Sequence, residues 1–309
     1  GTLVSVDWLA DLDLEAQLAL GRLTLAGLDF RDVTLALSGR DGRQQLVDFA
    51  SSFYEGNLSA SGELDLTRDP LHWQLAPRID RVRIDALLEA LGEASPPLRG
   101  RLNAEGELSS RGNTWPALKR HLDGRVGSRI EEGAILDVNV SRELCTAVAT
   151  LEGETATRDW HPDTRFERAE ASFQLRDGTA SSEDLLITLP GIELDGEGWL
   201  DLTSERFELG AAARLVDTAD AACRVDPRLE RVPFPVRCAG SLDGDSAEWC
   251  RFDRSAFQPT LVDLLRDEAG RRAGEEVERR LEGALEGLDE RVGEDAGREL
   301  RDALRGLFN

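Results

Sequence analysis

The chain has 309 residues, enough to bury a sizeable core as one elongated domain or two compact ones. Its 60 acidic and 37 basic residues give a net charge of −23, so its surface should repel nucleic acid and anionic membranes, and a nucleic-acid partner is disfavoured. No run of 18 apolar residues is present, and residues 1–30 lack the basic start and apolar centre of a signal peptide.

From the N-terminus, apolar and polar residues alternate over residues 8–37, which predicts at least three strands joined by short turns. The alternation continues through a hairpin at residues 40–67 and a strand that starts near Trp73. Residues 84–91 have the apolar spacing of a short helix, with Gly92 just past its end. Ser95-Pro96-Pro97 is then expected to separate two units.

Beyond this separator, strands are predicted at residues 98–108, 124–130, 169–175, 207–216 and 232–242, with another near Ile135. Asn113 or Thr114 can cap a helix that continues to Leu122. Residues 139–151 also have helical spacing.

One hairpin unit occurs twice, at a shift of 136 residues. Arg40-Asp41-Gly42 matches Arg176-Asp177-Gly178, and residues 62–67 match residues 198–203. Asp-Gly supplies the positive φ angles of a tight turn, and the two alternating stretches after it predict two strands, each with an apolar and a polar face. A shorter version of the motif occupies residues 100–108. Repeated units that cannot bury their apolar face alone must stack or curl together.

The last segment has a different period. Over residues 255–309 apolar residues recur every three or four positions, which indicates an amphipathic helix. Each glycine within it costs about 1 kcal/mol relative to alanine, so this helix needs a packing partner. We therefore divide the chain into a repeated β-hairpin groove domain, residues 1–254, and a C-terminal amphipathic helical segment, residues 255–309.

Signatures of catalysis are absent from the sequence, which has no G-x-S-x-G elbow, no phosphate-binding glycine loop and no H-E-x-x-H helix. Acidic pairs such as Glu183-Asp184 are expected by chance among 60 acidic residues. The three histidines lie far apart and suit ordinary surface or capping roles: His72, His121 and His161. We predict that the protein is not an enzyme, has no cofactor and has no metal site.

The four cysteines contain no C-x-x-C pair: Cys145, Cys223, Cys238 and Cys250. An even count without metal-ligand spacing favours disulfides in an oxidising compartment. Buried free thiols and a four-thiolate metal site are the alternatives.

The predicted sheet has one apolar face, which in most proteins packs on the protein's own helices. Here the predicted helices are too few and too short to cover every strand, so the sheet should curl into a groove that is free to bind a ligand. An acyl chain of about 16 carbons gains roughly 12 kcal/mol on leaving water, at about 0.8 kcal/mol per methylene. The predicted groove lining comprises Leu58, Leu64, Leu66, Leu102, Leu108, Ile192, Leu194, Leu200 and Leu202.

Several segments together resemble the C-terminal region of AsmA-like proteins. They are the R-D-G turns with their G-x-L-x-L strands, Trp115-Pro116-Ala117-Leu118 followed by Leu122-Asp123-Gly124, and Glu132-Gly133-Ala134-Ile135. The cysteine contexts are the most specific part: Arg142-Glu143-Leu144-Cys145, Ala222-Cys223-Arg224-Val225, Pro235-Val236-Arg237-Cys238 and Trp249-Cys250-Arg251. The resemblance covers roughly residues 10–265.

This resemblance implies a periplasmic protein of a diderm bacterium, attached to the inner membrane in the full-length protein by an N-terminal anchor missing here. It also implies a role in carrying phospholipid between the inner and outer membranes and in outer-membrane assembly, with no catalytic residues to carry over. Within it we expect Cys223 to pair with Cys238 and Cys145 with Cys250, closing loops worth about 3 and about 4.7 kcal/mol in the chain-entropy model.

We therefore expect an α+β, mainly β fold, with a strongly curved antiparallel sheet forming a groove (β-taco), flanking helices and a long C-terminal amphipathic helix. Phospholipid acyl chains are the expected partner, and the C-terminal helix should close one end of the groove or touch a membrane. The alternative is an envelope scaffold or interaction module with a closed core and no lipid cargo. A lipid-modifying hydrolase is disfavoured because no nucleophile and base pair stands out.

Overall fold

The computed structural model describes residues 1–137, 139, 161–215, 233–244, 249–253 and 256. The chain divides into two units, Gly1–Asp253 and Arg254–Asn309. The predicted C-terminal helix falls in the second unit, outside the described residues except for Ala256. The predicted helix at residues 139–151 likewise lies outside them, Asn139 excepted. The description below concerns the first unit.

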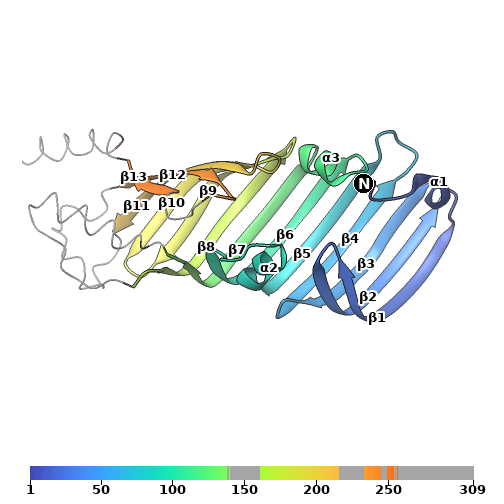
Figure 1. Cartoon of the computed structure of the whole chain (residues 1–309), viewed down its shortest axis with the longest axis horizontal. Coiled ribbons are helices and arrows are strands. Elements are labelled where there is room, and N and C mark those ends of the chain that lie inside the picture. Colours follow the sequence, from blue (N-terminus) through green and yellow to red (C-terminus); the bar gives the residue numbers. More distant parts are fainter. Residues whose placement is uncertain (138, 140–160, 216–232, 245–248, 254–255, 257–309) are drawn as a thin grey trace, which may run out of the picture. The chain divides into compact units, whose positions relative to one another are not determined.

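The first unit is built on one antiparallel sheet, whose strands are hydrogen-bonded in chain order (Figure 1). Its described part has 13 strands: β1 (Leu14–Leu25), β2 (Leu28–Arg40), β3 (Arg43–Phe53), β4 (Gly56–Asp65), β5 (His72–Arg83), β6 (Leu98–Arg111), β7 (Asp123–Ile135), β8 (Thr164–Arg176), β9 (Thr179–Leu189), β10 (Ile192–Asp201), β11 (Arg206–Leu215), β12 (Phe234–Ser241) and β13 (Cys250–Phe252). Its helices are α1 (Val6–Leu9), α2 (Ile84–Ala90) and α3 (Trp115–Arg120).

The predicted α+β fold, a groove with flanking helices and a long C-terminal helix, is wrong. The described chain is nearly all antiparallel sheet, and none of its helices exceeds 7 residues. Consecutive strands pair as hairpins, so the backbone groups of each inner strand are satisfied by its two neighbours without any helical layer. The described part is therefore an open all-β sheet rather than a groove bounded by helices.

The hairpin repeat seen in the sequence extends to three strands. Strands β2, β3 and β4 recur as β8, β9 and β10 with the same bounds, shifted by 136 residues. Both copies share the contact that closes the turn: the backbone N–H of Leu66 donates to the Gly42 carbonyl at 2.8 Å, and that of Leu202 donates to the Gly178 carbonyl at 2.9 Å. A break in register also recurs, beside Gly62 in the first copy and beside Gly198 in the second. The two copies are therefore structurally equivalent.

This equivalence gives a matched pair of glycine substitutions. Gly42 and Gly178 have φ angles of 73° and 78°, where an L side chain costs about 1–2 kcal/mol. A Cβ on Gly42 would meet the flexible end of Thr67 at 3.0 Å, whereas a Cβ on Gly178 would run into the backbone carbonyl of Lys119. Urea denaturation should show that Gly178→Ala lowers the free energy of unfolding by more than Gly42→Ala does. Equal losses of unfolding free energy would mean that the Lys119 backbone moves away from the added Cβ at no energetic cost.

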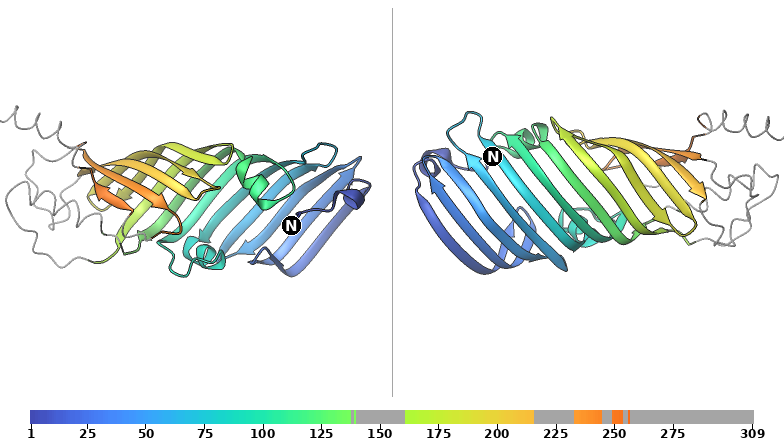
Figure 2. Two further views of the ribbon diagram at one scale, coloured as in Figure 1. Left: turned by 45° about the horizontal axis from the view of Figure 1, so that its top comes forward. Right: turned by 180° about the vertical axis from the view of Figure 1, so that it is seen from behind.

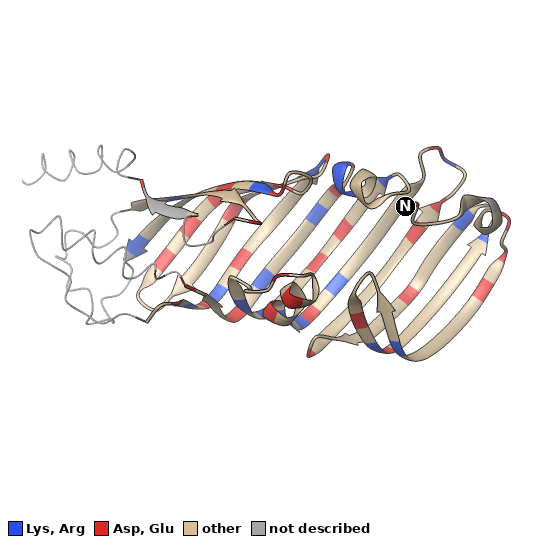
Figure 3. Ribbon diagram, viewed as in Figure 1, with Lys and Arg blue, Asp and Glu red and all other residues tan. Residues whose placement is uncertain are grey.

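The register divides the sheet into two faces, because successive side chains of a strand point to opposite sides. We call the face that carries Leu75 and Leu108 the apolar face, and the face that carries Gln74 and Ser109 the polar face. Charged residues lie along the strands between the apolar positions (Figure 3).

Two buried clusters cover parts of the apolar face. Toward one end of the strands, the buried residues Phe30, Val33, Phe53 and Val82 pack with Leu87 of α2. Toward the other end, Leu64, Leu66 and Leu71 pack under the N-terminal segment that includes α1. The short helices thus lie near the strand ends and leave the middle of the strands without a helical cover (Figures 1 and 2).

None of the described helices is both long and apolar enough to cross a lipid bilayer.

Candidate functional site

The main feature of the apolar face is a row of side chains that crosses the sheet at right angles to the strands. Each member is the direct cross-strand partner of the next from β1 to β12, and none is polar. Neighbouring strands lie about 4.8 Å apart, so the row is about 50 Å long. We call it the long row: Ala16, Leu37, Leu46, Gly62, Leu75, Leu108, Gly124, Leu175, Ala180, Leu200, Phe207 and Gly240.

A second row runs beside it from β5 to β12 and is also free of polar side chains. Its members are Val82, Leu102, Ile130, Ala169, Ile187, Leu194, Ala213 and Phe234. The two rows lie on the same face of these eight strands, and the positions between them include Ser128 and Ser182. The side chains of the two rows offer no proton donor or nucleophile, so the rows themselves can bind only apolar groups.

Parts of the apolar face are open to solvent. Leu18 is 47% exposed, Leu20 37% and Leu75 42%. By contrast, Ala213 and Phe234 at the far end of the second row are fully buried. The open part therefore lies toward β1 and β5, where these leucine side chains are partly in contact with water.

Most of the predicted lining residues lie on this face. Leu108 and Leu200 belong to the long row, Leu102 and Leu194 to the second row. Leu58 on β4 pairs with Ile79 on β5, and Leu64 and Ile192 are buried at strand ends. Leu66 and Leu202 lie just past the strand ends, where their backbone N–H groups close the repeated turn. Leu18, Leu20 and Leu75 were not predicted, although their alternation in the sequence could have identified them.

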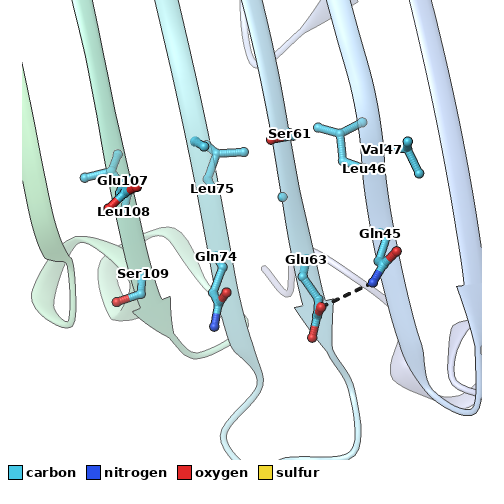
Figure 4. A pocket seen from close by; sticks show the side chains of 12 residues that line it. Gln45, Leu46, Val47, Ser61, Glu63, Gln74, Leu75, Glu107, Leu108 and Ser109 are labelled. Carbon is cyan, nitrogen blue, oxygen red and sulfur yellow. Dashed lines mark hydrogen bonds between the residues drawn. The ribbon is translucent and has the colours of Figure 1, made fainter.

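The polar face carries two shallow hollows. One, of about 570 Å³, crosses β3 to β6 over the polar row Gln45, Glu63, Gln74 and Ser109 (Figure 4). The other, of about 540 Å³, crosses β5 to β9 around Gly127. Cross-strand ion pairs line the second hollow, such as Arg78 with Glu105 at 3.2 Å. The second hollow is lined mainly by polar side chains, whereas half of the residues around the first are apolar or glycine and include Leu46, Leu75 and Leu108 of the long row.

Charged groups with shifted pKa values lie away from the rows. The pKa of Asp184 falls below its usual 3.8, mainly because its carboxylate accepts the backbone N–H of Ser172 at 2.7 Å. The pKa of Asp85 is also lowered, chiefly because Arg83 donates hydrogen bonds to it. These shifts belong to ion pairs and turns that hold the sheet, and in the described part of the chain no group with a shifted pKa belongs to either row.

Among the described residues, no three His, Cys, Asp or Glu side chains gather as a metal site requires.

Only two of the four cysteines, Cys238 and Cys250, lie among the described residues. Cys238 is buried on β12 and engaged in a disulfide. The backbone of Cys250 on β13 pairs opposite it, while Cys145 and Cys223 lie outside the described residues. Which cysteine bonds to which therefore stays a prediction.

The chain was compared with known proteins. The model of the AsmA family matches residues 5–185, more than half of the chain. Protein AsmA of Escherichia coli (strain K12) is 24% identical over 255 residues, which are 82% of this chain and 40% of that protein. The chain therefore spans less than half the length of this relative. No solved structure matches. Because the family model covers most of the sheet, the chain belongs to the AsmA family.

Proposed function

We propose that this protein acts in the cell envelope, where its apolar face holds phospholipid acyl chains during transport between the inner and outer membranes and so supports outer-membrane assembly. The observation that carries the proposal is the long row, about 50 Å without a polar side chain and partly open at Leu75. An acyl chain suits such a surface because each buried methylene contributes about 0.8 kcal/mol and needs no directional partner.

The proposed location is the periplasm, with attachment to the inner membrane. A phospholipid crossing an aqueous compartment needs an apolar surface along its path, because its acyl chains would otherwise be exposed to water. The scaffold alternative requires a face that the protein seals by itself. The exposure of Leu18, Leu20 and Leu75 favours a lipid cargo over that alternative.

Lipid analysis of the purified protein tests the proposal. The whole 309-residue chain would be isolated from cells, extracted with organic solvent and analysed by mass spectrometry, and then offered vesicles that contain labelled phospholipid. We expect phospholipid in at least equimolar amount and uptake of the label. A chain that neither carries phospholipid nor takes it up from vesicles contradicts the proposal.

A further inference from the structure

The connection between β6 and β7 is unlike other turns at the same strand ends. Each repeated turn has only two residues, Asp41-Gly42 between β2 and β3 and Asp177-Gly178 between β8 and β9. The connection between β6 and β7, by contrast, is residues 112–122 and contains α3. The insertion has a defined structure, because the Thr114 hydroxyl caps α3 by accepting the backbone N–H of Ala117 at 3.3 Å. A structured insertion where a tight turn would suffice is typical of a binding element.

The insertion and the end of β6 before it combine an exposed aromatic side chain with two arginines that form no ion pair with a described residue. Trp115 is 59% exposed. Residues 111–121 contain three basic residues and no acidic one, in a chain with a net charge of −23. Lys119 pairs with Glu205 at 3.1 Å, but Arg111 and Arg120 are exposed and form no ion pair with any residue in the described part of the chain.

Hydrogen bonds link this insertion to the N-terminal segment, which carries a second exposed tryptophan. Asn113 accepts the backbone N–H of Val4 at 2.9 Å and donates to the Val4 carbonyl at 2.8 Å. This pair of bonds fixes the N-terminal segment against the insertion. Trp8, four residues further on in α1, is 61% exposed.

A third exposed apolar residue lies on the other side of the insertion. The backbone N–H of Leu242 donates to the carbonyl of Glu205 at 2.8 Å, and Glu205 is the partner of Lys119. Leu242 is 42% exposed. Trp8, Trp115 and Leu242 thus follow one margin of the sheet, the margin along which α1 and α3 lie (Figures 1 and 2).

We propose that this margin, with Trp115, Arg111 and Arg120 at its centre, docks on the surface of a phospholipid bilayer. Tryptophan settles at the level of the lipid head groups, and arginine binds phosphate through its planar fork of donors. The acidic composition predicts repulsion from anionic membranes, but at physiological salt charges act over only about 8 Å, so the acidic residues farther than this from the arginines are screened. This inference goes beyond lipid transport and holds even for a sheet that carries no lipid.

Vesicle flotation tests the docking. The whole chain would be mixed with vesicles of phosphatidylethanolamine and phosphatidylglycerol at physiological salt, and the bound fraction measured. We expect Trp115→Ala to weaken binding at least about tenfold, through lost apolar burial, and Arg111→Gln and Arg120→Gln to weaken it about fivefold each. The matched control is Trp199→Ala, because Trp199 is 41% exposed on the polar face of β10 and should leave binding unchanged.

Three results would overturn the docking surface: an unmodified chain that does not float with vesicles, a Trp115→Ala chain that floats as well as the unmodified one, or equal losses for Trp115→Ala and Trp199→Ala. Failure of docking is distinguishable from failure of lipid transport. The phospholipid that co-purifies with Trp115→Ala, measured by extraction, should equal that of the unmodified chain, because Trp115 lies outside both rows.

Discussion

Replacing Leu18 and Leu75 together by glutamate is expected to reduce the phospholipid bound by the purified protein at least about tenfold. Both side chains lie on the open part of the apolar face, 47% and 42% exposed. A carboxylate at these positions stays hydrated and prevents an acyl chain from packing against the sheet. Loss of contact with only two methylenes costs about 1.6 kcal/mol, which corresponds to more than a tenfold loss of affinity. Mass spectrometry of the extracted lipid, expressed per mole of protein, measures the effect.

The sheet itself supplies the control for this experiment. Ala19 and Ala76 are the next residues on the same strands, are also exposed, and face the polar side opposite Thr34 and Ser61. Ala19→Glu with Ala76→Glu adds the same charge to the same strands and should leave the bound phospholipid unchanged. Equal losses in the two double variants would show that charge, and not the apolar face, governs lipid binding.

The largest effect on stability is expected at Phe53. Its ring is 4% exposed, stacks on Phe30 with ring centroids 5.0 Å apart, and meets Tyr54 edge-on at 4.6 Å. Phe53→Ala leaves a cavity in the cluster that joins β2, β3 and β5, so urea denaturation should show a loss of about 3–5 kcal/mol in the free energy of unfolding.

A partly exposed leucine is the matched comparison for Phe53. Leu75→Ala should cost less than about 1 kcal/mol, because its side chain is 42% exposed and a methyl group in its place leaves no closed cavity. The two substitutions thus separate the part of the apolar face that forms the core from the part left open. If Leu75→Ala proved as costly as Phe53→Ala, the leucine would belong to a sealed core.

Local patterns in the sequence predicted most of the elements. The alternation gave the strands after residue 40 except β13, and α2 and α3 lie where helical spacing and the cap at Thr114 placed them. Residues 8–37 were predicted as at least three strands joined by short turns. Instead β1 continues through Gly21, with Leu20 and Arg22 paired to β2 on either side of it.

The arrangement of the strands could not be predicted from local patterns. Ser95-Pro96-Pro97 was expected to separate two units, yet β5 and β6 pair across it, with Leu75 opposite Leu108. Strand pairing is a non-local property, so turn residues alone do not show whether a sheet ends or continues. For the same reason the α+β class was wrong, since short helical patterns do not show that every strand joins one sheet.

The candidate site was predicted in kind but not in detail. The sequence identified the face that carries Leu108 and Leu194, because alternation assigns residues to faces. Exposure along that face depends on what folds over it. Leu194 is 6% exposed whereas Leu75 is 42% exposed, although both follow the same alternating pattern.

A photo-reactive side chain tests the central claim most directly, because it reports which face touches lipid in the cell. Benzoylphenylalanine would be placed at position 75 on the apolar face and, in a separate chain, at position 76 on the polar face. After irradiation of living cells, we predict phospholipid adducts at position 75 and none at position 76. Adducts at neither position, or equal adducts at both, would contradict the account of the apolar face as the lipid-binding surface.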